Sequence, residues 1–353
     1  MRSCAYTPPT GMTENVCEYA GLRPVFVNRC EPSEWGCCLA MRKVLSKSRT
    51  VFLLCSLCLA LFFSQQAMAE PVAVNNLSSS TVAGTINPAN TTASTPTPLW
   101  RTLADGLELS VHTALHLVDG TFQPARGEDI FAVVRIDPEK YEFFLYMASE
   151  HGSALSLADW AKQKGLLAAI NASMYLPDKS TSTGHMQSLT HVNNERIGGR
   201  LGAFFLAEPL NGEGNSLPLA DIIERDHPEW AERLNSYAIR VQNFRLVTTG
   251  GHIPWKKDGP AHSIAAIATD AQGRILFAFS EYPMPIATFA EYLLLWPDLN
   301  IQTAMYVEGS DDSGLFVIDE QQHPLVWAGR TSVLNTKNPQ PVPLPNILGI
   351  RAR

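Results

Sequence analysis

Cysteine is absent from most of this 353-residue chain, because all seven cysteines lie within the first 58 positions. The remaining sequence therefore forms no disulfide bond and offers neither a cysteine nucleophile nor a cysteine-ligated zinc site. It also lacks the H-E-x-x-H and G-x-S-x-G motifs and any glycine-rich phosphate-binding loop. These absences exclude thiol proteases and most nucleotide-dependent enzymes.

Basic residues are scarce after position 69. The first 69 residues hold seven of the 27 Lys and Arg residues and four of the 34 Asp and Glu residues, which leaves 20 basic and 30 acidic residues. An acidic surface without basic stripes repels phosphate backbones and anionic lipids. We therefore expect neither nucleic acid nor an anionic membrane as a main partner, while a local cationic pocket stays open.

Residues 41–69 have the three parts of a secretory signal peptide. A basic segment, MRKVLSKSRT, precedes the apolar run VFLLCSLCLALFF, and AMA precedes Glu70 as an A-x-A cleavage site. The alternative, a transmembrane anchor, needs about 20 apolar residues, and this run is shorter. We predict cleavage after Ala69, a periplasmic or secreted location without a membrane anchor after cleavage, and a misassigned start that accounts for residues 1–40.

The rest of the chain divides into a linker and one domain. Residues 70–98 are rich in Ser, Thr, Asn and Pro and are predicted to be disordered, whereas residues 99–353 contain about ten apolar, β-branched runs. Helical patterns lead into apolar strands twice, at 156–164 before 166–170 and at 287–296 before 301–307. Because helices and strands do not alternate regularly, we expect an α+β fold: a mixed, mostly antiparallel sheet core with two or three helices packed on it.

Four short blocks carry a resemblance to a known family. In chain order they are NASMY (171–175), RVQNF (240–244), AHSIAA (261–266) and MYVEGS (305–310). Each block is a strand followed by a loop. In this order, the blocks resemble those of the phosphodiester glycosidase family (uncovering-enzyme-like). That family includes an uncovering enzyme that removes N-acetylglucosamine from a sugar phosphodiester, together with many secreted bacterial proteins of undefined substrate. The resemblance spans residues 105–351.

The four blocks also depart from the family's pattern. Ser173 and Ser310 stand where the family has glycine, and Glu308 stands where it has aspartate. His262 occupies the position of the family's strand arginine, which exchanges a permanent cation for one that depends on pH. The resemblance therefore implies a divergent member.

Cleavage of a glycosidic bond usually requires two carboxyl groups. Glu308 follows the apolar strand at 301–307 and is the candidate acid or nucleophile, while Gly309 lets a substrate approach. Asp311 and Asp312 are candidates for the second carboxylate or for calcium ligands, and calcium is the one cofactor that the sequence leaves open. The alternative for the whole segment is a solvated β-turn.

Polar side chains of the other blocks complete the expected site. Asn171 is a candidate catalytic residue that orients a sugar hydroxyl or a water, with a turn cap as the alternative. Arg240 and Gln242 share one strand face and are expected to contact a phosphate together, with a surface ion pair as the alternative for Arg240. His262 and His185 are candidates for protonating a leaving group or contacting the phosphate, with a structural role as the alternative. The remaining expected substrate-binding residues are Ser173, Tyr175, Asn243, Gly309 and Ser310.

Aromatic residues near these blocks, Tyr175, Trp255 and Tyr306, are candidates either for a sugar-stacking platform or for packing. The sequence thus predicts an exported hydrolase acting on a sugar phosphodiester or a related cell-envelope glycan linkage, with a carbohydrate as its partner. The alternative is a non-catalytic module on the same fold that binds a glycan or exopolysaccharide.

Overall fold

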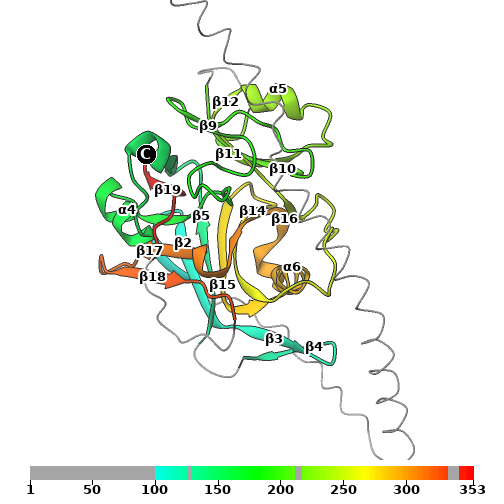
Figure 1. Cartoon of the computed structure of the whole chain (residues 1–353). Helices are drawn as coiled ribbons and strands as arrows, with labels where there is room; N and C mark the ends of the chain where they lie inside the picture. Colours follow the sequence, from blue (N-terminus) through cyan, green and yellow to red (C-terminus); the bar gives the residue numbers. More distant parts are fainter. Residues whose placement is uncertain (1–99, 126–128, 211–216, 333–341) are drawn as a thin grey trace, which may run out of the picture. The chain divides into compact units, whose positions relative to one another are not determined.

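The computed structural model describes residues 100–125, 129–210, 217–332 and 342–353 (Figure 1). The predicted upstream extension, signal peptide and linker lie outside these residues. Within the described ranges, no helix is both long and apolar enough to cross a membrane.

Three large antiparallel sheets form the body of the described part of the chain. The largest has seven strands in the spatial order β1 (Arg101–Ala104), β2 (Leu107–Thr113), β5 (Ile130–Ile136), β15 (Ile275–Met284), β14 (His262–Asp270), β16 (Ile301–Gly309) and β13 (Arg245–Val247). A five-stranded sheet follows the order β11 (Ala220–Glu224), β10 (Ala203–Pro209), β12 (Tyr237–Asn243), β8 (Met186–Gln187) and β9 (Val192–Asn194). The second five-stranded sheet follows the order β18 (Pro324–Ala328), β17 (Gly314–Ile318), β7 (Ala168–Asn171), β19 (Asn346–Ala352) and β6 (Tyr141–Met147).

Smaller elements connect these strands. The described residues include a separate hairpin of β3 (Leu115–Val118) and β4 (Thr121–Pro124), the helices α3 (Ala148–His151), α4 (Leu157–Lys164), α5 (Trp230–Asn235) and α6 (Ile286–Leu295), and the 3₁₀ turns η2 (Pro297–Leu299) and η3 (Ser310–Asp312).

The predicted α+β class is wrong, because the described part of the chain is a β-rich sandwich. Every strand pairing in the described ranges is antiparallel, so the sheets are not mixed. The central segments of β14 (264–268) and β16 (304–307) are apolar because one face packs on the other sheets and the opposite face packs on α6 and loops. A continuous apolar run shows that both faces are buried, but it does not show what buries them.

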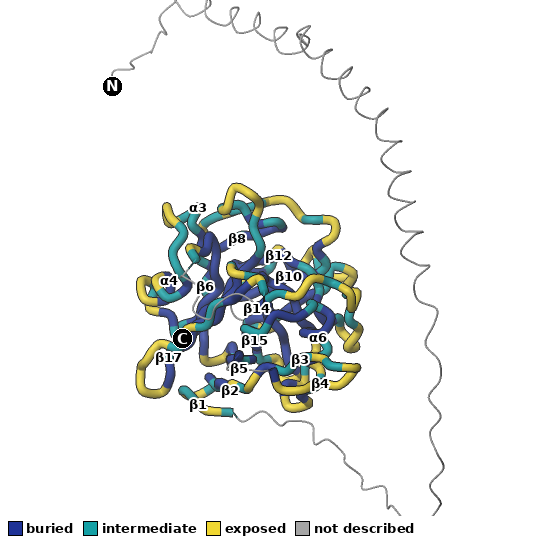
Figure 2. Tube along the Cα trace, turned by 60° about the horizontal axis from the view of Figure 1, so that its bottom comes forward, coloured by how far each residue is buried: buried dark blue, intermediate teal, exposed yellow. Residues whose placement is uncertain are grey.

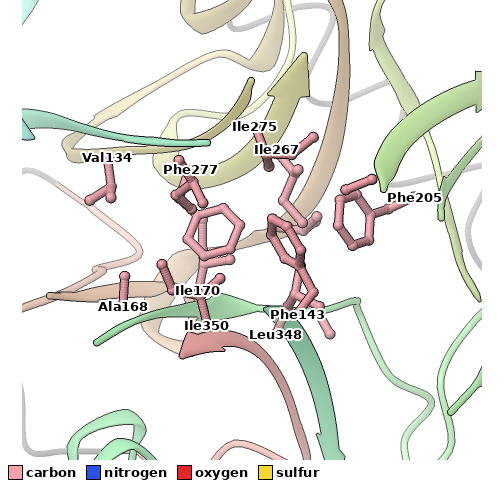
Figure 3. Packing of buried hydrophobic residues seen from close by; sticks show 14 of the residues in the cluster. Val134, Phe143, Ala168, Ile170, Phe205, Ile267, Ile275, Phe277, Leu348 and Ile350 are labelled. Carbon is pink, nitrogen blue, oxygen red and sulfur yellow. The ribbon is translucent and has the colours of Figure 1, made fainter. Parts of the chain in front are cut away.

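The sandwich core lies where the three sheets meet, and Figure 3 shows its packing. Phe143 of β6 contacts both other sheets: its ring centroid lies 5.5 Å from that of Phe205 on β10 and 6.4 Å from that of Phe277 on β15. Both contacts are edge-to-face, the geometry that aromatic quadrupoles favour. In Figure 2 the buried strands of this core are surrounded by exposed connecting loops.

Two helix–strand units that the sequence predicts are present, and they position the strand ends. At the start of α4, Ser156 accepts a hydrogen bond from the Asp159 N–H (3.1 Å), and Gly165 ends the helix with a left-handed backbone before β7. Helix α6 likewise leads through η2 into β16. Consequently β7 and β16 end beside the loop that leads into β17.

Candidate active site

Glu308 lies at a bulge near the end of β16. In the register with β14, Glu308 and Tyr306 lie opposite two consecutive residues of β14, so Val307 between them is an extra residue. The amide of Asn243, from β12, donates a hydrogen bond to the Val307 carbonyl oxygen (3.1 Å). Because a bulge redirects the side chains next to it, this contact helps to set where Glu308 points.

The Glu308 side chain is nearly buried, with 9% of its surface exposed. Burial raises the pKa of Glu308 to about 8, the Gly309 N–H bonded to Oε1 (2.9 Å) opposes this rise, and the neighbouring Asp312 carboxylate adds to it. Glu308 is therefore protonated at neutral pH. A protonated carboxyl group at a strand end has the properties of a general acid.

Two phenols and a second carboxylate surround Glu308, and we call Glu308, Asp312, Tyr175 and Tyr306 the Glu308 cluster. Tyr175 hydrogen-bonds to the Asp312 carboxylate, and its pKa is raised first by burial and then by Asp312 and Glu308. Burial also raises the pKa of Tyr306, with Glu308 as the second cause. Both phenols stay neutral, so Tyr175 donates its proton toward Asp312 and keeps that carboxylate in place.

Position 309 has no room for a side chain, so only glycine fits there. A Cβ atom at this position would collide with the Tyr306 hydroxyl and the His262 imidazole. The Nδ1 atom of His262 lies 2.8 Å from the Ser263 carbonyl oxygen, and since a carbonyl only accepts, Nδ1 carries the proton. The His262 ring lies beside Tyr306 of the Glu308 cluster, with the two ring centroids 6.3 Å apart.

Asn171 at the end of β7 holds the loop that follows Glu308. Its Nδ2 donates to the Asp312 carbonyl oxygen, and its Oδ1 accepts from the Gly314 N–H (2.8 Å). Both ends of the amide are thus engaged with the loop, which gives Asn171 a positioning role in this structure. Ser310 in the same loop has a positive φ of 61°, a backbone conformation that favours glycine.

Ser173 and Asn243 belong to a buried polar network behind the cluster. The Ser173 hydroxyl accepts hydrogen bonds from Ser182 (3.1 Å) and Asn243 (3.4 Å), and its backbone N–H donates to the Asn346 Oδ1 atom (2.9 Å). This network connects the loop after β7 with β12 and β19. Through Asn243 it also reaches the Val307 bulge.

Arg240 and Gln242 do not join the Glu308 cluster. The Nε atom of Arg240 donates to the Tyr237 carbonyl (2.7 Å), so the guanidinium binds its own strand's backbone. Gln242 is fully buried; its Oε1 accepts from the Gly198 N–H (2.7 Å), and its Nε2 donates to the carbonyls of Gly198 (3.0 Å) and Leu201 (2.9 Å). Both side chains thus bind backbone groups, whereas the sequence predicts that they contact a phosphate together.

His185 likewise lies with Arg240 and not with Glu308. Its Nδ1 is 3.3 Å from the Glu195 carbonyl oxygen, and burial is the main cause that lowers its pKa, with Arg240 contributing. The ring is neutral at pH 7 and stabilises the segment before β8.

Asp311 is exposed, unlike its neighbour Asp312. In the described parts of the chain, no three His, Cys, Asp or Glu side chains come close enough together to hold a metal ion. The acidic loop therefore separates its carboxyl groups: Asp312 faces Tyr175 within the cluster, and Asp311 lies on a neighbouring cavity.

Several residues near the site were not predicted as site residues from the sequence. Ser182 and Asn346 carry no motif, and the fold alone brings them to Ser173. Glu281 follows the apolar run of β15, which is the signal that identified Glu308, so the same rule could have found it. Of the three aromatic candidates, Tyr175 and Tyr306 belong to the Glu308 cluster, and Trp255 lies beside it with its ring centroid 5.9 Å from that of Tyr306.

Comparisons with known proteins give a fold but no family. A scan against protein families finds no match, and no curated protein matches either. Among solved structures, the chain is similar to the catalytic domain of zebrafish N-acetylglucosamine-1-phosphodiester alpha-N-acetylglucosaminidase auto-inhibited by its pro-peptide. That match has a TM-score of 0.52 and 13% identity, and covers 72% of this chain and 86% of that one.

A hypothetical protein from Synechocystis is similar to the same degree. It has a TM-score of 0.51 and 14% identity, over 74% of this chain and 65% of the other. At such identities the likeness shows a shared fold. The resemblance carried by the four sequence blocks is thus supported at the level of the fold.

Proposed function

We propose that this chain is an exported hydrolase that cleaves a glycosidic linkage, in a sugar phosphodiester or a related cell-envelope glycan, with Glu308 as its general acid. The observation that carries the proposal is the buried Glu308 carboxyl group beside a second carboxyl group, Asp312, at the end of β16. Glycoside hydrolysis usually uses a pair of carboxyl groups that lie in different environments.

In this mechanism the protonated Glu308 gives its proton to the leaving oxygen as the bond to the anomeric carbon breaks. The Asp312 carboxylate, oriented by Tyr175, stabilises the developing positive charge and then acts as base or nucleophile. The half-exposed rings of Tyr175 and Trp255 border the sugar site, and the half-exposed His262 ring contributes a polar group to the same border. Asn171 and Asn243 keep the loop and the bulge in place.

Two further observations support the proposal. The fold is shared with a domain whose name describes a phosphodiester glycosidase, although only the fold is common to both chains. The predicted signal peptide at 41–69 supports export.

The test is hydrolysis of chromogenic aryl glycosides and aryl sugar phosphodiesters by the wild-type protein and by Glu308→Gln. Glutamine keeps the oxygen that accepts the Gly309 N–H but has no proton to transfer, so we expect turnover to fall at least 100-fold. Arg240→Gln is the matched control and should keep its activity, because Arg240 binds its own strand. Retained activity in Glu308→Gln would contradict the assignment. Tight glycan binding without turnover would favour the non-catalytic binding module.

A further inference from the structure

Residues 174–183, which follow β7, form a short hairpin that brings Tyr175 to the Glu308 cluster, and we call them the Tyr175 hairpin. Tyr175 and Ser182 pair across it as an antiparallel bridge. Backbone hydrogen bonds flank this bridge on both sides, from the Thr183 N–H to the Met174 carbonyl oxygen (3.0 Å) and from the Leu176 N–H to the Thr181 carbonyl oxygen (2.7 Å). In an antiparallel pair with this pattern, the N–H and the carbonyl of Ser182 itself point away from the hairpin.

Two consecutive asparagines of β9 bind those two backbone groups. The Asn193 Oδ1 atom accepts a hydrogen bond from the Ser182 N–H (2.7 Å), and the Asn194 Nδ2 atom donates to the Ser182 carbonyl oxygen (2.7 Å). Asn193 also donates from Nδ2 to the Ser180 carbonyl oxygen (3.1 Å) and to the Ser149 hydroxyl of α3 (2.8 Å). Ser182 is buried, so its position is determined by side chains of a strand outside the hairpin.

A bulge in β9 explains how two consecutive side chains reach one residue. In a regular strand they would point to opposite faces of the sheet. In the register with β8, Gln187 pairs with Val192 and Met186 pairs with Asn194. Asn193 is therefore an extra residue in β9. Bulges redirect side chains and are frequent next to active sites, and this one directs both asparagines toward the Tyr175 hairpin.

The opposite arm of the Tyr175 hairpin contacts the second carboxyl group of the cluster. The Tyr175 phenol hydrogen-bonds to the Asp312 carboxylate, and its pKa is raised first by burial and then by Asp312. An O–H···O hydrogen bond is lost when its two oxygens move apart by about 1 Å. A small displacement of Ser182 would therefore reach Asp312 through Tyr175.

We propose that Asn193 and Asn194 are positioning residues of the active site: they fix Ser182, and through it Tyr175, which orients the Asp312 carboxylate. The inference rests on the proposed hydrolase function, to which it adds the residues that keep the second carboxyl group in place. Both asparagines act through the Tyr175 hairpin and not on the substrate.

Asn194→Asp tests the proposal with the smallest change of shape. Aspartate keeps the oxygen that accepts the Arg196 N–H (2.9 Å), but it sets an oxygen against the Ser182 carbonyl where asparagine has a donor. Asn235→Asp on α5 is the matched control, because that amide also donates to a backbone carbonyl, the one of Ala231 (3.1 Å). With the aryl glycoside or aryl sugar phosphodiester that the wild type hydrolyses, we expect kcat/KM to fall by about tenfold or more in Asn194→Asp and to stay within about twofold in the control.

A double-mutant cycle distinguishes positioning from a general loss of stability. Tyr175→Phe removes the hydroxyl that binds Asp312, so Asn194→Asp should lower kcat/KM by no more than about twofold further in the Tyr175→Phe background. Equal losses from Asn194→Asp in both backgrounds would overturn the proposal, as would unchanged turnover in Asn194→Asp itself. Asn193→Ala is the second variant, and it carries the same expectations if Asn194→Asp does not fold.

Nuclear magnetic resonance of tyrosine labelled with ¹³C at Cζ tests the positioning without catalysis, since this carbon reports ionisation of the phenol. Tyr175→Phe assigns the resonance of residue 175 among the nine tyrosines of the chain. In the wild type this resonance should not titrate up to pH 10, whereas in Asn194→Asp and Asn193→Ala it should titrate like that of an exposed tyrosine, whose pKa is about 10. Circular dichroism identifies the variants that are folded.

The two readouts separate failure of the inference from failure of the proposed function. If the Tyr175 resonance titrates only in the asparagine variants although no compound is hydrolysed, the positioning of Tyr175 is supported and the hydrolase function alone fails. If the resonance stays unchanged in folded Asn194→Asp and Asn193→Ala, the positioning role is refuted whether or not the wild type is active.

Discussion

Glu308 makes the stability of the folded protein depend on pH in a direction that can be worked out from the structure. Its pKa is about 8 in the folded state, against 4.5 for a glutamate in its ordinary environment. Between these two values only the folded state holds the proton, so the free energy of unfolding falls as the pH rises and levels off above 8. The difference of about 3.5 in pKa, at about 1.4 kcal/mol each, amounts to about 5 kcal/mol.

The Glu308→Gln variant isolates this effect. Glutamine resembles the protonated acid in shape and keeps the acceptor for the Gly309 N–H, so the variant and the wild type should be about equally stable at pH 5. At pH 9 the variant should be more stable by about 4 kcal/mol, since its side chain has no proton to lose. Urea unfolding followed by tryptophan fluorescence at pH 5, 7 and 9 measures the difference, in which titrating groups that do not interact with Glu308 cancel. A stability difference that does not change between pH 5 and 9 would refute the buried, protonated state of Glu308.

Three other substitutions test how the site is held. Asn171→Ala removes both amide contacts and leaves the Asp312 carbonyl and the Gly314 N–H without partners, so urea unfolding should show a loss of about 3 kcal/mol. Ser310→Gly removes the cost of a positive φ and should raise the free energy of unfolding by about 1 kcal/mol, whereas a lower melting temperature would contradict this. Gln242→Ala should cost about 3 kcal/mol yet leave KM unchanged in the folded protein, since its amide binds backbone and not substrate; an isolated rise in KM would contradict this.

The parts of the fold that local chemistry determines could be predicted from the sequence. Ser156 and Gly165 mark the two ends of α4, and the segment 271–273 between two apolar runs predicts the hairpin of β14 and β15, which pair along their length. The arrangement of the sheets could not be predicted in this way. The core brings together Phe143, Phe205 and Phe277, which lie far apart in the chain. A short segment of sequence around any one of them does not indicate that contact.

The same distinction explains the outcome for the site residues. Glu308 follows an apolar run, so its place near the end of a buried strand can be predicted from the sequence around it. Arg240 and Gln242 were correctly expected to share a strand, but Arg240 binds the Tyr237 carbonyl of that same strand and Gln242 binds the loop near Gly198. A strand pattern gives the spacing of the two side chains without giving the groups that they contact.

The two serines that stand where the resembled family has glycine differ physically, and the difference bears on whether the site is retained. Ser310 keeps a backbone conformation suited to glycine, with φ of 61°, so the loop after Glu308 has the shape that a glycine would give it. Ser173 is not among the described residues with positive φ; its hydroxyl instead binds Asn243, whose amide also holds the Val307 carbonyl at the bulge. Ser310 therefore preserves the conformation of the loop at the cost of backbone strain. Ser173 adds a hydrogen bond to Asn243, which in turn holds the strand that carries Glu308. Divergence at these positions is thus compatible with a working acid at the end of β16.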